Sequence, residues 1–183
     1  MERHRRSEYV ILRRTIAHRG ALRPVLVLSG LGVWAASLIA VLALLPYPVA
    51  AAIPLLVLVV TFEVIRPLHF GAERIGRYLQ VFYEEAGEPG RSVGDTPSWE
   101  RVAMRFGAVP GVGGHPLFVP LFFFAVVIDV FMVGTLTSPV TLETAFVAGA
   151  HGLFVAWMFI TDRAMRKQRS IELERLRQMR NPS

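Results

Sequence analysis

Two ionisable residues, Asp129 and His151, lie inside long apolar stretches of this sequence. An ionised Asp in the middle of a bilayer costs at least about 2.5–3.5 kcal/mol on insertion scales. Asp129 lies about 20 Å along its stretch and His151 about 14 Å along the next one, counted from opposite sides of the membrane. In a hydrocarbon core of roughly 30 Å their depths are therefore similar. We expect Asp129 to face other helices and to pair with His151.

Three kinds of chemistry fit such a pair. It can be a neutral hydrogen bond that joins two neighbouring helices, a relay for protons or cations, or part of a metal or haem site. The metal or haem site is disfavoured. His69 and His115 lie nearer the cytoplasmic side of the membrane, and no H-x-x-x-H or E-x-x-H motif completes a set of ligands. We expect no metal and no cofactor.

A second polar group interrupts the stretch TFEVIRPLHFGAERIGRYLQVFYEE, residues 61–85. Glu63 and Arg66 are three residues apart and share one helix face. Pro67 has no N–H for the carbonyl of residue 63, so a bend is expected there. One interpretation is a paired charge and a hinge at the membrane boundary. The other places Glu63, Arg66 and His69 at the mouth of a conduction path or a headgroup pocket.

Four apolar segments must position these residues, and each is near the length of about 20 residues that a bilayer requires. They cover about 24–45, 47–66, 116–136 and 142–161, with tight turns at LLPYPVA and TSPVT. The sequence therefore predicts one integral membrane domain over 1–183, an all-α, polytopic bundle of four transmembrane helices with cytoplasmic amphipathic extensions.

The basic residues predict the orientation. Seven lie in residues 1–23, six in 66–115 and seven in 162–183, which accounts for all 20, and the two short turns contain none. Because Lys and Arg mark the cytoplasmic side, both termini and the central loop are expected in the cytoplasm. We expect a multi-pass protein of the bacterial inner membrane.

The cytoplasmic parts are predicted to be helical. The second span continues to about residue 85, and the fourth continues through 162–183, supported by Glu172–Arg175 and Glu174–Arg177 neighbours. Within the central loop, 67–115, residues 98–106 predict a further helix. Spacing in ERIGRYLQVFYEE separates an apolar face from a polar face: the first holds Ile75, Leu79, Phe82 and Tyr83, and the second holds Glu73, Arg77, Gln80 and Glu84.

Small residues recur every four positions in two of the spans, a spacing that allows helices to approach closely. The first span has Gly32, Ala36 and Ala40, and the fourth has Ala148, Gly152 and Ala156. Packing within the chain and a seam between chains both fit this pattern.

Composition removes several functional classes. The chain has no Cys, so thiolate metal centres and disulfides are excluded. Its basic residues flank apolar spans, and nucleic acid is not an expected partner. No nucleophile elbow or phosphate loop is present, so we expect no enzyme.

Two hypotheses are favoured. The first is an oligomeric ion or proton channel or transporter with a polar path through the membrane. The alternative is a non-catalytic accessory or structural subunit of a larger membrane complex. In both the lipid bilayer is a partner, together with further copies or other chains. A third class, a membrane-embedded enzyme that acts on lipid headgroups, is disfavoured.

Overall fold

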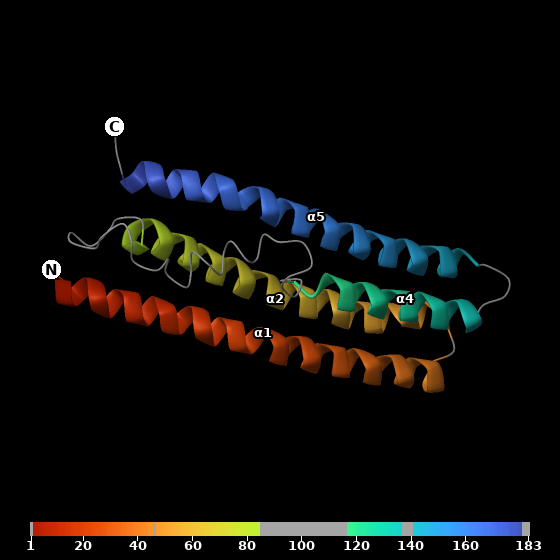
Figure 1. Cartoon of the computed structure of the whole chain (residues 1–183). Coiled ribbons are helices and arrows are strands. Elements are labelled where there is room, and N and C mark those ends of the chain that lie inside the picture. Colours follow the sequence, from red (N-terminus) through yellow and green to blue (C-terminus); the bar gives the residue numbers. More distant parts are fainter. Residues whose placement is uncertain (1, 46, 85–116, 137–140, 181–183) are drawn as a thin grey trace. The chain divides into compact units, whose positions relative to one another are not determined.

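The chain is all-helical in the part that the structure, a computed structural model, describes: residues 2–45, 47–84, 117–136 and 141–180. These residues form four long helices, labelled in Figure 1, and two short helical turns, and no strand occurs among them. The elements are α1 (Glu2–Leu44), the 3₁₀ turn η1 (Pro48–Ala51), α2 (Ala52–Leu79), the π-helical turn η2 (Gln80–Glu84), α4 (Val119–Leu136) and α5 (Leu142–Arg180). The predicted all-α class is confirmed.

Among the described residues, three helices are long and apolar enough to cross a membrane, namely α1, α2 with its flanking turns, and α5. The predicted third span corresponds to α4, Val119–Leu136, whose described apolar stretch is Val119–Met132. At about 1.5 Å per residue, the 18 residues of α4 extend about 27 Å. Three of the four predicted spans thus meet the length and composition of a membrane span.

The helices extend further than the predicted spans. α1 begins at Glu2 rather than near residue 24, and Pro24 lies inside it. Its ring faces the carbonyl of Gly20, and membrane helices tolerate such positions. α2 continues through Pro67 as predicted, and α5 continues through the C-terminal tail. The predicted helix at 98–106, like residues 85–116 as a whole, lies outside the described residues.

The contacts of the chain separate into two units. The apolar unit contains residues 22–67 and 115–164, and the polar unit contains residues 1–21, 68–114 and 165–183. α1, α2 and α5 each contribute residues to both units.

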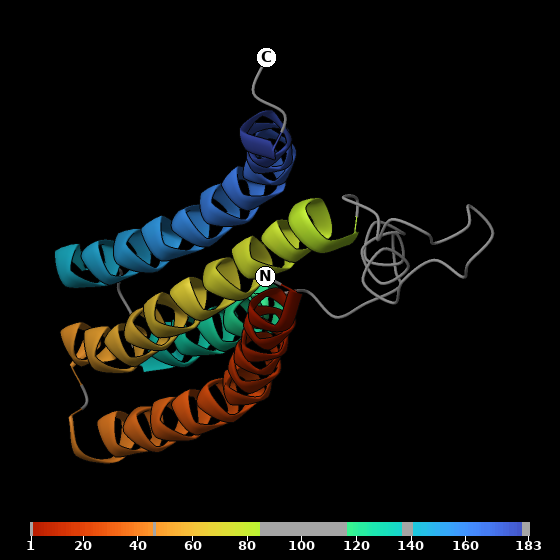
Figure 2. The ribbon, with the colours of Figure 1, turned by 90° about the vertical axis from the view of Figure 1, so that its left-hand side faces the viewer.

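In the apolar unit the buried side chains recur at spacings of three and four, so each helix has one inward face. At its centre, the Phe62 ring meets the rings of Phe122 and Phe154 edge-on, with centroids 5.6 and 5.9 Å apart. These contacts bring α2 beside α4, as Figures 1 and 2 both show. The buried set includes Val27, Trp34, Leu38, Val41, Leu55, Leu58, Ile65, Ala125, Val126 and Met158.

Large apolar side chains also cover the outside of the apolar unit. Leu28, Leu153 and Phe131 are 65–75% exposed. In water such a surface would drive aggregation, whereas lipid tails solvate it without cost. The outward faces therefore have the character of a lipid-facing surface.

The polar unit is joined by aromatic and charged side chains. The hydroxyl groups of Tyr78 and Tyr83 both donate to the Glu8 carboxylate, at 3.1 and 2.7 Å. Arg180 donates to the carbonyl oxygen of Val81 at 3.0 Å. These bonds connect α2 and its π-helical turn with α1 on one side and with α5 on the other.

Candidate functional site

The predicted approach of Asp129 to His151 is confirmed. Their side chains are 0% and 1% exposed, and Asp129 Oδ2 lies 3.2 Å from His151 Nε2. Asp129 comes from α4 and His151 from α5, at a sequence separation of only 22. The contact joins two helices that follow each other in the chain.

The second nitrogen of His151 determines how many protons the pair holds. His151 Nδ1 lies 2.7 Å from the carbonyl oxygen of Val147. A carbonyl oxygen only accepts, so Nδ1 carries a hydrogen. The contact between Nε2 and Oδ2 then needs one further proton, since two lone pairs would otherwise face each other. The pair is therefore a one-proton site without net charge, written as neutral Asp with neutral His or as carboxylate with imidazolium.

Apolar side chains enclose the pair. Phe122, Ala125 and Val126 precede Asp129 on the buried face of α4, and Phe154 and Met158 follow His151 on the buried face of α5. The next buried polar residues on α5 are Thr161 and Asp162, beyond Phe154 and Met158. Along this described face of α5, the polar positions are thus separated by two apolar turns.

One oxygen of the pair is left over. Asp129 Oδ1 is buried without a hydrogen-bond partner among the described residues. A buried unpaired acceptor costs about 1–3 kcal/mol, which is reduced if that oxygen carries less charge. Asp129 Oδ1 is thus a polar atom of the pair for which the described residues supply no hydrogen bond.

Glu63 and Arg66 form the predicted pair and gain a third member. Arg66 Nη2 lies 2.7 Å from Glu63 Oε2, and Trp157 Nε1 donates to Glu63 Oε1 at 2.7 Å. The Arg66 guanidinium also lies 5.5 Å from the centre of the Trp157 ring. This triad links α2 to α5. Nothing in the sequence spacing indicated Trp157, which is 94 residues from Glu63.

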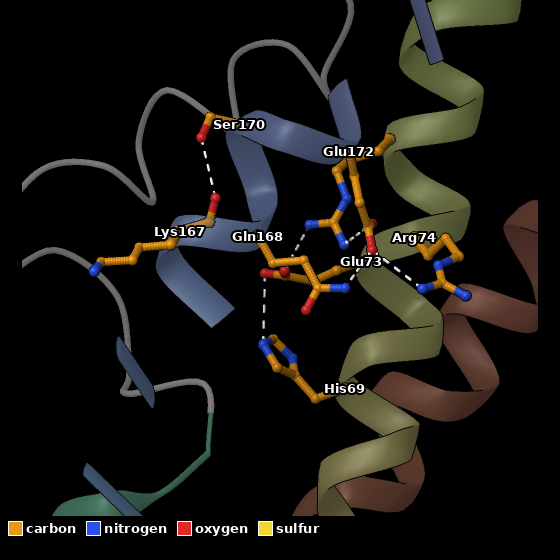
Figure 3. A network of polar contacts seen from close by, with 8 residues as sticks. His69, Glu73, Arg74, Lys167, Gln168, Ser170 and Glu172 are labelled. Carbon is orange, nitrogen blue, oxygen red and sulfur yellow. Dashed lines mark hydrogen bonds and ion pairs between the residues drawn. The ribbon is translucent and has the colours of Figure 1, made fainter. Parts of the chain in front are cut away.

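His69, the third residue predicted at a mouth, belongs to a different group of contacts. It is buried, with Nε2 at 3.5 Å from Glu73 Oε1. Figure 3 shows this contact at the edge of a polar network between α2 and α5 in the polar unit. His69 therefore serves that network, while Glu63 and Arg66 pair with Trp157.

The network centres on Arg77, which shares the predicted polar face of this helix with Glu73. Arg77 is only 4% exposed, and its guanidinium lies 2.9 Å from Glu73 and 2.7 Å from Glu172. Arg74 and Gln168 also donate to Glu172, at 3.1 and 2.7 Å. The prediction assigned Glu172 to Arg175 on its own helix, but its partners Arg74 and Arg77 lie on α2.

These partners act on the charge of Glu172. Burial by itself raises the pKa of the Glu172 carboxyl, whereas the donors Arg74 and Gln168 and the charge of Arg77 lower it. The donors prevail and hold the pKa below its ordinary value. Glu172 is thus a fixed negative charge between α2 and α5.

Within the described part of the chain, the small-residue faces of α1 and α5 are exposed. Gly32, Ala36, Ala40, Ala148, Gly152 and Ala156 are all exposed. A Cβ added to Gly32 or Gly152 would meet nothing within 4 Å. The close approach occurs instead at Gly30, where an added Cβ would overlap the side chain of Thr61 on α2.

These features define a class, that of all-helical proteins with membrane-like apolar surfaces. Among the described residues, no three His, Cys, Asp or Glu side chains gather as a metal site would require. No protein-family model, no curated protein and no solved structure matches the chain. Its function must therefore be argued from its own residues.

Proposed function

We propose that this protein is a non-catalytic structural subunit of a membrane assembly, in which its apolar helices pack against another membrane chain. The observation that carries the proposal is the outward position of both small-residue faces, Gly32–Ala40 on α1 and Ala148–Ala156 on α5. A lipid-facing helix has no need of shallow, closely spaced small residues. Another helix does, because its backbone can then approach closely.

The two faces differ from their surroundings. Leu28 beside the α1 face and Leu153 beside the α5 face are 70% and 75% exposed. The small residues of each face thus have longer, exposed apolar side chains near them on the same helix. In membranes, association depends on such packing because the hydrophobic effect contributes nothing between helices.

The Asp129–His151 pair has a structural role in this proposal. In a bilayer the apolar faces of α4 and α5 are interchangeable with lipid, so apolar contacts alone specify their register weakly. A buried polar contact between one residue of each helix is satisfied in only one register. We infer that the pair fixes α4 against α5 and so presents the outward face of α5 in a single orientation.

Single-cysteine cross-linking tests the proposal, since the natural chain has no Cys. Ala36→Cys and Gly152→Cys, each in full-length protein in native membranes, are expected to form cross-linked products with a short bifunctional reagent. Ile39→Cys and Leu153→Cys are the matched controls, exposed on the same helices but not in the rows of small residues. Products at the control positions alone, or at none of the four, would contradict the proposal.

A second candidate function, proton transport, is favoured by one observation. Asp129 and His151 share a single proton, and Asp129 Oδ1 has no described partner. A relay also needs access from both sides, for which Phe154 and Met158 leave no polar step on the buried face of α5. Proton flux into vesicles that contain the purified protein distinguishes the candidates. Flux that disappears in Asp129→Asn supports transport, and flux equal to protein-free vesicles supports the structural role.

We further propose that the protein lies in a bacterial inner membrane with both termini and residues 66–115 in the cytoplasm. The support is the distribution of the 20 basic residues, all of which lie on one predicted side. Reporter fusions after residues 47, 90, 139 and 183 should read outside, inside, outside and inside. A periplasmic signal at residue 90 would reverse the scheme.

A further inference from the structure

We propose that Glu63, Arg66 and Trp157 together bind the headgroup of an aminophospholipid, a lipid that carries a phosphate and a primary ammonium group. All three residues belong to the apolar unit, with Glu63 and Arg66 on α2 and Trp157 on α5. Glu63 and Arg66 are the first charged residues of α2, so they mark the end of its apolar part. Such binding requires the proposed membrane location, but it does not involve the small-residue faces.

Two neighbours hold the Arg66 guanidinium in a fixed position. Its Nη2 lies 2.7 Å from Glu63 Oε2, and its central carbon lies 5.5 Å from the centre of the Trp157 ring. The indole is held in turn, because Trp157 Nε1 donates to Glu63 Oε1 at 2.7 Å. A planar guanidinium presents its N–H groups in a fork that suits a phosphate. The Arg66 side chain is 33% exposed, and among the described residues Glu63 is its only ion-pair partner, so further N–H groups are available to a ligand.

Glu63 supplies the opposite charge. Its two oxygens contact Arg66 and Trp157, one each, and a carboxylate oxygen can accept a second hydrogen bond. The side chain is 34% exposed, so an ammonium group can reach it. Glu63 and Arg66 together carry no net charge, which favours a zwitterionic headgroup over an anionic one. The ammonium of phosphatidylethanolamine has N–H groups that can donate to Glu63, whereas the choline of phosphatidylcholine has none.

Exposed apolar side chains continue the site towards the membrane interior. Leu56 and Val60 precede Glu63 by seven and three residues on α2, so they share its helix face. They are 61% and 54% exposed. A phospholipid whose headgroup contacts the triad can cover both side chains with an acyl chain, whereas a soluble phosphate ester contacts the triad alone. Trp157 is 43% exposed, and membrane proteins concentrate Trp beside the headgroups. The chemistry of the site therefore indicates a lipid.

Quenching of Trp157 by brominated lipids measures the preference of the site. Trp34 and Trp99, the other two Trp residues, are replaced by Phe in the full-length protein. This parent protein is placed in phosphatidylcholine vesicles that contain a small fraction of brominated phosphatidylethanolamine, phosphatidylglycerol or phosphatidylcholine, with the bromines near the headgroup. We expect brominated phosphatidylethanolamine to bind about threefold more tightly than either of the other two, the equivalent of about 0.6 kcal/mol for one polar contact in a membrane.

Substitution of Glu63 should change the order of the lipids. Glu63→Gln leaves the charge of Arg66 uncompensated, so brominated phosphatidylglycerol should become the preferred lipid, by about fivefold over phosphatidylcholine. Glu143→Gln removes the same charge from an exposed position in the first turn of α5, and as the matched control it should leave the order unchanged. Arg66→Gln removes the phosphate contact. It should lower the preference for brominated phosphatidylethanolamine over brominated diacylglycerol, which has no phosphate, by about threefold.

The outcomes distinguish this site from the proposed function. Quenching of the parent protein without a preference for phosphatidylethanolamine overturns the site alone, and so does the same change of order in Glu143→Gln. Absence of quenching by every lipid overturns both the site and the proposed membrane location. Displacement of the brominated lipid by millimolar phosphoethanolamine at constant ionic strength would identify a site for soluble molecules and overturn the lipid proposal. The expected order in the parent protein and its change in Glu63→Gln, with circular dichroism that verifies folding, support the site.

Discussion

Replacing both members of the Asp129–His151 pair should damage the protein less than replacing either one. Asp129→Leu leaves His151 Nε2 buried without a partner, at a cost of about 1–3 kcal/mol. His151→Leu leaves the carboxyl of Asp129, which is 0% exposed, without its described partner. Breaking a buried pair in this way costs about 3–5 kcal/mol in soluble proteins. In the double variant neither polar group remains.

The double variant is therefore expected to be close to the parent, because apolar replacement of a buried pair is often neutral or stabilising. Polar contacts in membrane proteins are weaker than in water-soluble ones, with a maximum of about 1.7 kcal/mol. We accordingly expect the two single substitutions together to cost about 1–2 kcal/mol in the membrane protein, and a double variant close to the parent then gives a coupling free energy of the same size.

The assay is unfolding by sodium dodecyl sulfate in mixed micelles, followed by Trp fluorescence. Asp129→Asn is the control, because it keeps the shape of the side chain and its amide N–H can donate to His151 Nε2. The free energy of unfolding of this variant should be lower than that of the parent by less than about 0.6 kcal/mol. Strictly additive effects of the two Leu substitutions would refute the reasoning, because they would mean that the side chains contribute independently.

Three other predictions follow from contacts in the two units. Gly30→Ala should lower the free energy of unfolding by about 1–3 kcal/mol, because the added Cβ overlaps the side chain of Thr61. Gly32→Ala is the matched control: its added Cβ meets nothing within 4 Å, so the free energy of unfolding should change by less than about 0.5 kcal/mol. Arg77→Met should destabilise far more than Arg74→Gln in the same unfolding assay, because Arg77 is 4% exposed and Arg74 is 69% exposed, and equal effects would contradict this. The pKa of Glu172 is lowered in the folded state, so its carboxylate makes its full contribution to the free energy of unfolding above the ordinary pKa of 4.5. This contribution is lost as the pH falls through the pKa of the folded state. Between pH 7 and pH 3, the free energy of unfolding of Glu172→Gln should therefore fall less than that of the parent protein.

Much of the fold was predictable because membrane helices are long and uniform. The Asp129–His151 contact was predictable because the two residues lie at similar depths in the predicted membrane. A short turn makes their helices neighbours, and a buried carboxyl needs a partner. The Glu63–Arg66 pair followed from a spacing of three. These are local or nearly local relations, which sequence periodicity describes well.

Sequence spacing did not indicate which face of a helix turns inward. In ERIGRYLQVFYEE, polarity placed Arg77 on one face with Glu73, but nothing local indicated that Arg77 is buried beside Glu172 of α5, 95 residues away. On the first span, spacing identified Gly32, but the bulky residues Val27 and Trp34 turn a different face inward and place Gly30 against Thr61. Such rotations are decided by the shape of the neighbouring helix, which no single segment encodes.

The mass of the assembly in solution tests the structural-subunit proposal most directly. Full-length protein extracted from its own membranes in a mild detergent is measured by light scattering, with the detergent contribution subtracted. We predict a protein mass well above the 20.4 kDa of one chain, and a shift towards 20.4 kDa in the variant with both Ala36→Leu and Gly152→Leu. A parent protein of 20.4 kDa, or a variant whose mass is unchanged, would contradict the proposal that these faces bind another helix.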